Sequence, residues 1–273
     1  MLQKLKDIDD REMPLLDHLI ELRTRLMYAC GAIFLGFVVC YFFAPQIYAF
    51  LVQPLADIYE GQTGRRMIYT GLAEAFFTYL KVAFFAGAFL TFPFVAFQVW
   101  LFIAPGLYRN EKKAFMPFLI ATPVLFFTGG AIVYYLIFPL AWRFFLSFET
   151  SGVDGSLPIQ LEARVSEYLD LVMKLIFAFG LCFQLPVALT LMGRVGLVTS
   201  EQLARNRKYA VVLTFVVAAV LTPPDIISQV GLALPVLLLY EISIHAVRMV
   251  ERRRAEAEAA EADDDEGETS TPA

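Results

Sequence analysis

Long runs of apolar residues constrain the fold of this chain more than any other feature. Four of them hold about 20 residues or more with few charges, at 26–44, 75–104, 115–138 and 168–192. A helix of about 20 apolar residues crosses the roughly 30 Å hydrocarbon layer of a bilayer. Apolar side chains make up 58% of the chain, more than one soluble core can bury. We therefore expect an all-α membrane protein.

Two shorter apolar runs follow, at 209–221 and 226–244, separated by the turn Thr222-Pro223-Pro224-Asp225. At a rise of 1.5 Å per residue the first covers only about 20 Å, less than the hydrocarbon thickness. We expect six transmembrane helices of which the fifth and sixth are short. The alternative is a single re-entrant hairpin at 209–244.

The positive charges fall mainly in alternate loops. Sixteen of the 22 Lys and Arg residues lie before residue 27, near 110, around 200 and after 247. The positive-inside rule places these segments, and hence both termini, in the cytoplasm under either count of helices. We expect a cytoplasmic segment at 1–25, a six-helix transmembrane domain at 26–247, and an acidic cytoplasmic tail at 248–273, in which a helix extension fades into a disordered end.

The runs at 75–104 and 168–192 share a residue pattern at an offset of 93, which pairs Pro93 with Pro186. The shared pattern has two explanations. Either a helical hairpin was duplicated, or two helices that cross the membrane in the same direction have similar residues because they have similar surroundings. Because proline removes a backbone hydrogen bond, we expect a bend at both positions.

Gln184 is the strongly polar residue nearest the middle of a span. Such a side chain usually faces protein or a water-filled cavity, so it forms either a helix-to-helix hydrogen bond or a polar spot on a binding surface. One functional alternative is a secondary transporter that uses Gln184, Lys81 and Lys174 around a midplane cavity. A purely structural scaffold is another.

Two carboxylates lie on the basic cytoplasmic side. Glu21 precedes Arg25 by four residues, the spacing of an ordinary ion pair on a helix, and Glu111 is the only acid in its basic loop. Carboxylates on such a surface suit a ligand with guanidinium groups, which bind carboxylate in a bidentate manner. Spacing alone leaves open whether the two converge.

Signatures of enzymes are missing from the sequence. It holds no HExxH, GxSxG, Walker or Rossmann pattern, only two histidines, and three cysteines that all lie in apolar runs. We expect a protein that is not an enzyme, with no catalytic residue, cofactor, metal or nucleic-acid partner.

Three segments closely resemble the TatC family of twin-arginine protein translocases. They are HLIELRTRL at 18–26, FIAPGLYRNE at 102–111 and LTPPDIISQ at 221–229. The resemblance covers about residues 14–250 and includes the Gln-Pro-Leu at Pro54. It implies six helices in a concave, glove-like bundle that binds the twin-arginine signal peptides of folded proteins. It also implies export driven by the proton-motive force, partners of the single-span TatA and TatB type, and self-association in the cell inner membrane.

The resemblance also implies roles for single residues. Glu21 and Glu111 look like the carboxylates of the signal-peptide site, and the residues that shape this site are Arg23, Arg25, Phe102 and Pro105. An intramembrane or assembly role is implied for Gln184, Pro54, Asp225 and Gln229. Gln184 lies where other members often have Glu, so a titrating role at this position is in doubt.

Overall fold

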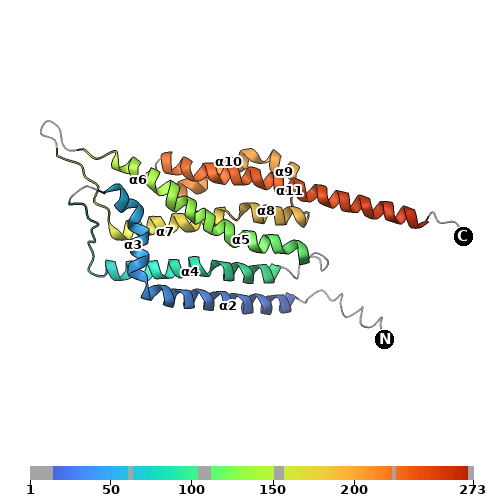
Figure 1. Ribbon diagram of the computed structural model, residues 1–273, viewed down its shortest axis with the longest axis horizontal. Helices are drawn as coiled ribbons and strands as arrows, with labels where there is room; N and C mark the ends of the chain where they lie inside the picture. Colours follow the sequence, from blue (N-terminus) through green and yellow to red (C-terminus); the bar gives the residue numbers. More distant parts are fainter. Residues whose placement is uncertain (1–14, 61–63, 104–111, 151–156, 223–225, 270–273) are drawn as a thin grey trace. The chain divides into compact units, whose positions relative to one another are not determined.

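The computed structural model describes residues 15–60, 64–103, 112–150, 157–222 and 226–269. In these ranges the chain is helical, and β-structure is limited to two isolated bridges. The elements are α2 (Leu15–Phe42), α3 (Ala44–Ile58), α4 (Glu74–Ile103), α5 (Lys112–Ile132), the π-helix η3 (Val133–Ile137), α6 (Phe138–Leu146), α7 (Val165–Cys182), α8 (Leu185–Arg194), α9 (Ser200–Arg205), α10 (Arg207–Leu221) and α11 (Ile226–Thr269), drawn in Figure 1.

Five stretches in the described ranges are long and apolar enough to cross a membrane. They are Leu16–Phe42, Glu74–Phe102, Pro117–Leu146, Val165–Arg194 and Ser228–Glu256. The expected fifth helix corresponds to α10, which at 15 residues is short for a full crossing. Large apolar side chains such as Phe34, Leu90 and Leu238 are more than 60% exposed. Lipid is the solvent that makes such exposure favourable.

The last helix is longer than the apolar run that predicts it. The run ends at residue 244, whereas α11 continues to Thr269 and so includes most of the tail whose end we expected to be disordered. The segment after 250 is rich in Ala, Glu and Arg, which have high helix propensities. A helix can therefore leave the apolar region and continue without a break, although hydropathy places its end earlier.

The chain forms two compact units, and the first comprises residues 1–48 and 76–123. In this unit α2 lies alongside α4 (Figure 1). A Cβ atom on Gly36 would lie 2.9 Å from the carbonyl oxygen of Gly87, so the two backbones are nearly in contact. Cys40, Ala44 and Ala83 continue the contact as a buried cluster. Small residues of this kind let helices pack closely in lipid, where van der Waals contact drives association.

The second unit comprises residues 49–75 and 124–273. Glycines again mark its closest helix contacts. A Cβ atom on Gly129 of α5 would lie 2.8 Å from the carbonyl oxygen of Phe179 in α7. One on Gly193 of α8 would lie 2.7 Å from the side chain of Val247 in α11. Neither position leaves room for a larger residue, so these packing distances require glycine.

The fourth apolar run is interrupted just before Pro186, where its sequence predicts a bend. Helix α7 ends at Cys182, and α8 begins at Leu185. Between them the backbone N–H of Gln184 donates to the carbonyl oxygen of Leu181 at 2.9 Å, which closes a tight turn. The matched Pro93 lies inside α4, which continues through it from Glu74 to Ile103. The shared pattern therefore does not produce the same break in both helices.

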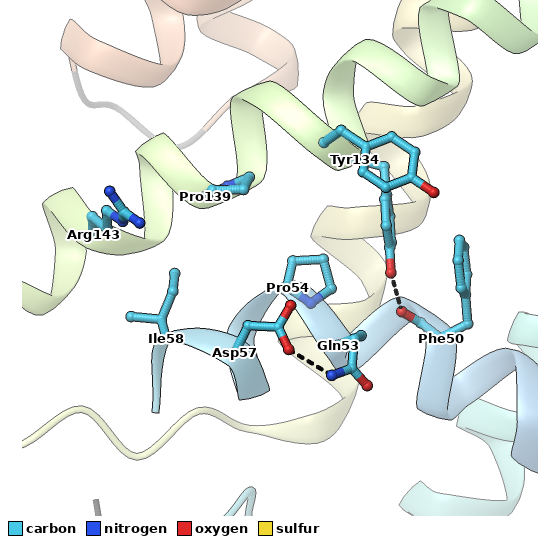
Figure 2. Close-up of a pocket in the computed structure, with 9 residues that line it drawn as sticks. Phe50, Gln53, Pro54, Asp57, Ile58, Tyr134, Pro139 and Arg143 are labelled. Carbon is cyan, nitrogen blue, oxygen red and sulfur yellow. Dashed lines mark hydrogen bonds between the residues drawn. The ribbon is translucent and has the colours of Figure 1, made fainter. Parts of the chain in front are cut away.

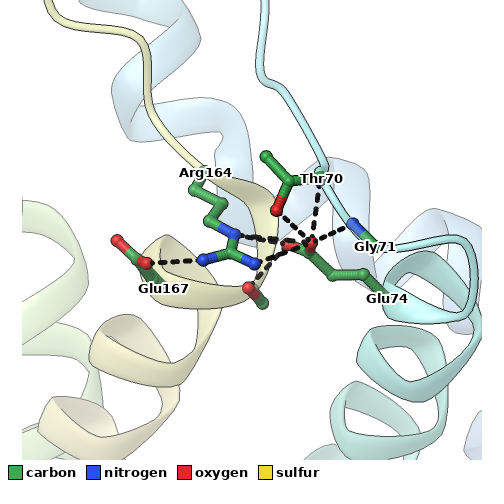
Figure 3. A network of polar contacts seen from close by, with 6 residues as sticks. Thr70, Gly71, Glu74, Arg164 and Glu167 are labelled. Carbon is green, nitrogen blue, oxygen red and sulfur yellow. Dashed lines mark hydrogen bonds and ion pairs between the residues drawn. The ribbon is translucent and has the colours of Figure 1, made fainter.

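A polar network joins the segment before α4 to the start of α7 within the second unit (Figure 3). Glu74 accepts hydrogen bonds from the backbone amides of Thr70 and Gly71 at 2.9 and 3.1 Å. It also accepts one from the hydroxyl of Ser166 at 2.6 Å and forms an ion pair with Arg164 at 3.2 Å. The Glu74 side chain is 9% exposed, so these contacts form a nearly buried connection between the start of α4 and the start of α7.

Candidate functional site

Glu21 lies on the first unit's α2 within a small polar cluster. Its Oε1 atom accepts a hydrogen bond from Nη2 of Arg25, one helical turn later, at 3.3 Å. Nη1 of the same guanidinium reaches Oε1 of Gln98 on α4 at 3.5 Å. Gln98 is only 6% exposed, whereas the Glu21 side chain is 21% exposed. Arg25 is thus held between two helices and in turn positions a carboxylate that solvent can reach.

An aromatic contact joins the same two helices near this cluster. The imidazole of His18 stacks on the ring of Phe102, with the ring centroids 4.3 Å apart and an interplanar angle of 15°. His18 precedes Glu21 by three residues, and Phe102 follows Gln98 by four, so each pair shares one face of its helix. The predicted site residues Glu21, Arg25 and Phe102 therefore belong to one α2–α4 contact.

The remaining predicted residues of this site are placed less closely or are not described. Arg23 is on α2 with an exposed side chain, and no contact of it with the cluster is recorded. Pro105 and Glu111 lie outside the described residues. Whether the second carboxylate approaches Glu21 therefore stays a prediction.

Two contributors to the cluster were missed by the sequence reasoning, namely His18 and Gln98. Gln98 interrupts the apolar run at 75–104, and a buried amide of that kind must find a hydrogen-bonding partner. Gln98 precedes Phe102 by four residues, and this spacing could have placed it on the same helix face as a predicted site residue. The pairing with Arg25, which is 73 residues away in the chain, depends on the packing of α2 against α4.

Three of the four residues expected to act within the membrane or in assembly are described, and they lie at separate places in the second unit. Pro54 is buried on α3. Nε2 of Gln184 donates to the carbonyl oxygen of Gly180 at 3.4 Å, within the turn that joins α7 to α8. Nε2 of Gln229 on α11 donates to the carbonyl oxygen of Phe215 on α10 at 3.2 Å. Asp225 lies outside the described residues.

Lys174, which the transporter alternative assigns to a solute cavity, has a structural contact. Its Nζ donates to the carbonyl oxygen of Val220 at 3.0 Å, close to the C-terminal end of α10. A helix C-terminus carries partial negative charge, so a cation is stabilised there. This contact links α7 to α10.

Among the described residues, no group of three or more His, Cys, Asp or Glu side chains could hold a metal ion. Cys30, Cys40 and Cys182 are free thiols. The chemistry that the α2–α4 cluster offers is recognition, through one accessible carboxylate, a positioned guanidinium and an aromatic face. A ligand with guanidinium groups fits that set.

Comparison with known proteins gives a consistent result. The family model described as "Sec-independent protein translocase protein (TatC)" matches residues 17–235. The TatC protein of Magnetococcus marinus is 54% identical over 252 residues, covering 92% of this chain and 90% of that protein. The TatC of Escherichia coli is 39% identical over 231 residues, covering 85% and 86% of the two chains.

A solved structure agrees at the level of the fold. A crystal structure described as the twin-arginine translocase receptor TatC superposes with a TM-score of 0.73 at 35% identity. The match covers 86% of this chain and 99% of that one. It confirms the predicted helical membrane fold, and the six-span expectation is consistent with it. On the family match and these relatives, the chain belongs to the TatC family of Sec-independent protein translocases.

Proposed function

We propose that this chain is the receptor and core subunit of a twin-arginine translocation system. It binds the twin-arginine signal peptides of folded proteins, and export is driven by the proton-motive force. Glu21, together with Glu111, binds the arginine pair of the peptide, while Arg23, Arg25, Phe102 and Pro105 shape the site. The chain acts by binding and performs no covalent chemistry.

The arrangement around Glu21 is the observation that carries this proposal. Arg25 engages Oε1 of the carboxylate, and no partner of Oε2 is recorded among the described residues. The contact with Arg25 is a single one of 3.3 Å to Oε1, and the Glu21 side chain is 21% exposed, so solvent and a second cation can still reach the carboxylate. An incoming arginine can therefore bind Oε2 and form a charge-assisted hydrogen bond.

The proposal includes partners and a location. The chain works with single-span proteins of the TatA and TatB type and with further copies of itself. It lies in the inner membrane with both termini in the cytoplasm, which the alternation of Lys and Arg along the loops supports. Pro54, Gln184, Asp225 and Gln229 are proposed to serve assembly within the membrane.

Cross-linking to a photoreactive twin-arginine signal peptide tests the site. The Glu21→Gln change combined with Glu111→Gln should lower cross-linking by about 100-fold or more, since each of the two lost charge-assisted bonds is worth roughly 1.5–3 kcal/mol. A twin-lysine peptide should cross-link weakly to the unmodified protein. The matched control is Asp17→Asn, which removes an exposed carboxylate on the same helix. Unchanged cross-linking in the double variant would refute the site.

Single cysteines test the orientation. In a chain whose three native cysteines are replaced, Arg66→Cys should react with a membrane-impermeant maleimide in spheroplasts. Glu256→Cys should react only after the membrane is permeabilised. The reverse pattern would contradict the cytoplasmic placement of the C-terminus.

A further inference from the structure

A cavity of about 700 Å³ lies within the second unit, between α3 and the η3–α6 segment (Figure 2). Its lining combines aromatic, aliphatic and charged side chains from Phe50, Gln53, Pro54, Asp57, Ile58, Tyr134, Tyr135, Pro139 and Arg143. A volume of this size suits a small molecule or the headgroup region of a lipid. None of the roles proposed above uses this cavity as a binding site.

Opposite charges line the cavity without pairing to each other. Asp57 on α3 accepts a hydrogen bond of 2.5 Å from Nε2 of Gln53, one turn earlier. Arg143 on α6 has an exposed side chain, and no ion pair or hydrogen bond of its guanidinium is recorded among the described residues. Figure 2 shows the two charged groups on separate elements that border the cavity. A ligand that carries both a cation and an anion can satisfy both groups at once.

A rigid aromatic contact forms one wall. The rings of Phe50 and Tyr134 stack with centroids 4.4 Å apart and an interplanar angle of 4°. The Tyr134 hydroxyl donates to the carbonyl oxygen of Phe50 at 2.7 Å, which fixes the ring of η3 against α3. This tyrosine belongs to a π-helical turn, a local irregularity that is frequent at functional sites.

The end of an apolar stretch long enough to cross a membrane lines part of the cavity. Arg143 is in the last turn of the apolar stretch Pro117–Leu146, where a long cationic side chain reaches the headgroup layer. Two residues of the same stretch are strongly exposed, Tyr135 at 72% and Leu140 at 54%. Tyr135 also lines the cavity. Lipid that covers these side chains therefore has its headgroup at the opening of the cavity.

We propose that this cavity binds the headgroup of an amine-bearing phospholipid such as phosphatidylethanolamine. The guanidinium of Arg143 binds the phosphate, and the carboxylate of Asp57, oriented by Gln53, binds the ammonium group. The acyl chains follow the exposed surface of Tyr135 and Leu140. Pro54, a proposed assembly residue, then also forms part of the cavity wall.

The two charges make the site selective among lipids. An ammonium group donates hydrogen bonds to Asp57, whereas the quaternary ammonium of phosphatidylcholine has no N–H to donate. Phosphatidylglycerol carries no cation, so Asp57 would repel its phosphate. If Asp57 and Arg143 were only solvated surface charges, neither preference would exist.

Native mass spectrometry of the full chain, purified in detergent with equal amounts of the three lipids, tests this selectivity. We expect phosphatidylethanolamine to be retained about three- to tenfold more than phosphatidylglycerol, as one exposed charge-assisted contact allows. Asp57→Asn should abolish that preference. Arg143→Gln should lower retention of both lipids by a similar factor. Equal retention of the lipids by the unmodified protein would overturn the proposal.

Matched controls remove the same charges outside the cavity. Glu60→Gln and Arg66→Gln change exposed residues of the same unit that do not line it, and both should leave lipid retention unchanged. Soluble phosphoethanolamine should compete only weakly, because it lacks the acyl chains. If it competes as strongly as the lipid, the site is one for free phosphoamines.

A photoreactive residue in place of Tyr135 separates lipid from protein as the occupant. In membranes it should form adducts with phospholipid, detectable as an added lipid mass on the chain. Adducts with another polypeptide alone would overturn the assignment. This readout does not involve signal peptides, so it can fail while the proposed receptor function stands.

Discussion

Gly36 on α2 and Gly87 on α4 bring two transmembrane helices to backbone contact. A Cβ atom on Gly36 would lie 2.9 Å from the carbonyl oxygen of Gly87 and 2.7 Å from the Thr91 side chain. The Arg25–Gln98 hydrogen bond joins the same two helices, so it depends on this spacing.

Gly87→Val should therefore separate α2 from α4. Overpacking at such a contact costs roughly 1–3 kcal/mol, and we expect a lower thermal unfolding midpoint in detergent together with weaker signal-peptide cross-linking. Gly31→Val is the matched control, because a Cβ atom there meets nothing within 4 Å. Similar midpoints for the two variants would contradict the close packing.

Gln98→Leu should weaken signal-peptide cross-linking less than the loss of the carboxylates does. Gln98 acts only through Arg25, and their contact of 3.5 Å is long for a hydrogen bond. We expect a decrease of less than about fivefold, equivalent to roughly 1 kcal/mol. Gln160→Leu, an exposed loop change, should have no effect. A loss as large as that of the double carboxylate variant would mean that Gln98 contacts the peptide itself.

Arg65 and Glu149 should make the stability of the second unit depend on pH. Arg65 binds both carboxylate oxygens, one of them at 2.6 Å, and the amide of Leu161 donates to Oε1 at 2.7 Å. The hydrogen bond from Arg65 is the main reason that the pKa of Glu149 is lowered in the folded protein. This contribution is complete above the unfolded pKa of about 4.3 and is lost as the pH falls through the lower folded value.

Thermal unfolding between pH 7 and pH 3 measures this effect. The midpoint of the unmodified protein should fall more steeply at the acidic end than that of Glu149→Gln, which has no carboxyl proton to bind. Glu60→Gln, a change at an exposed glutamate, should follow the unmodified protein. Parallel curves for all three proteins would exclude a contribution from the Arg65 pair.

Glu251 should hold the start of α9 against α11. Its carboxylate accepts the backbone amide of Ser200 at 2.8 Å and the Ser200 hydroxyl at 2.5 Å. Glu251→Ala should speed amide hydrogen exchange across 199–206, because two hydrogen bonds worth about 1–3 kcal/mol each are lost. Glu256→Ala, which changes an exposed residue of the same helix, should not. Unchanged exchange in Glu251→Ala would show that the Thr199 capping box alone holds α9.

Local features of the chain were sufficient for several predictions. Apolar length predicted the membrane spans, because the cost of exposing charges to hydrocarbon is a property of each segment alone. The bend expected at Pro186 followed from a missing backbone donor. The same reasoning did not distinguish Pro93, through which α4 continues. The apolar run alone ends before α11 does, and the helix propensity of the following Ala, Glu and Arg residues indicates the extension.

Contacts between distant segments were beyond such reasoning. Glu21 and Arg25 could be paired from their spacing, whereas Gln98 joined them only because Gly36 and Gly87 allow α2 and α4 to approach. Likewise, Asp57 and Arg143 are separated widely in the sequence, and they line one cavity because α3 contacts η3, which directly precedes α6. The sequence determines which side chains share one face of a helix, because this depends only on their spacing along the chain. The burial and the partners of a charged side chain depend on which helix packs beside it, and only the tertiary structure decides that.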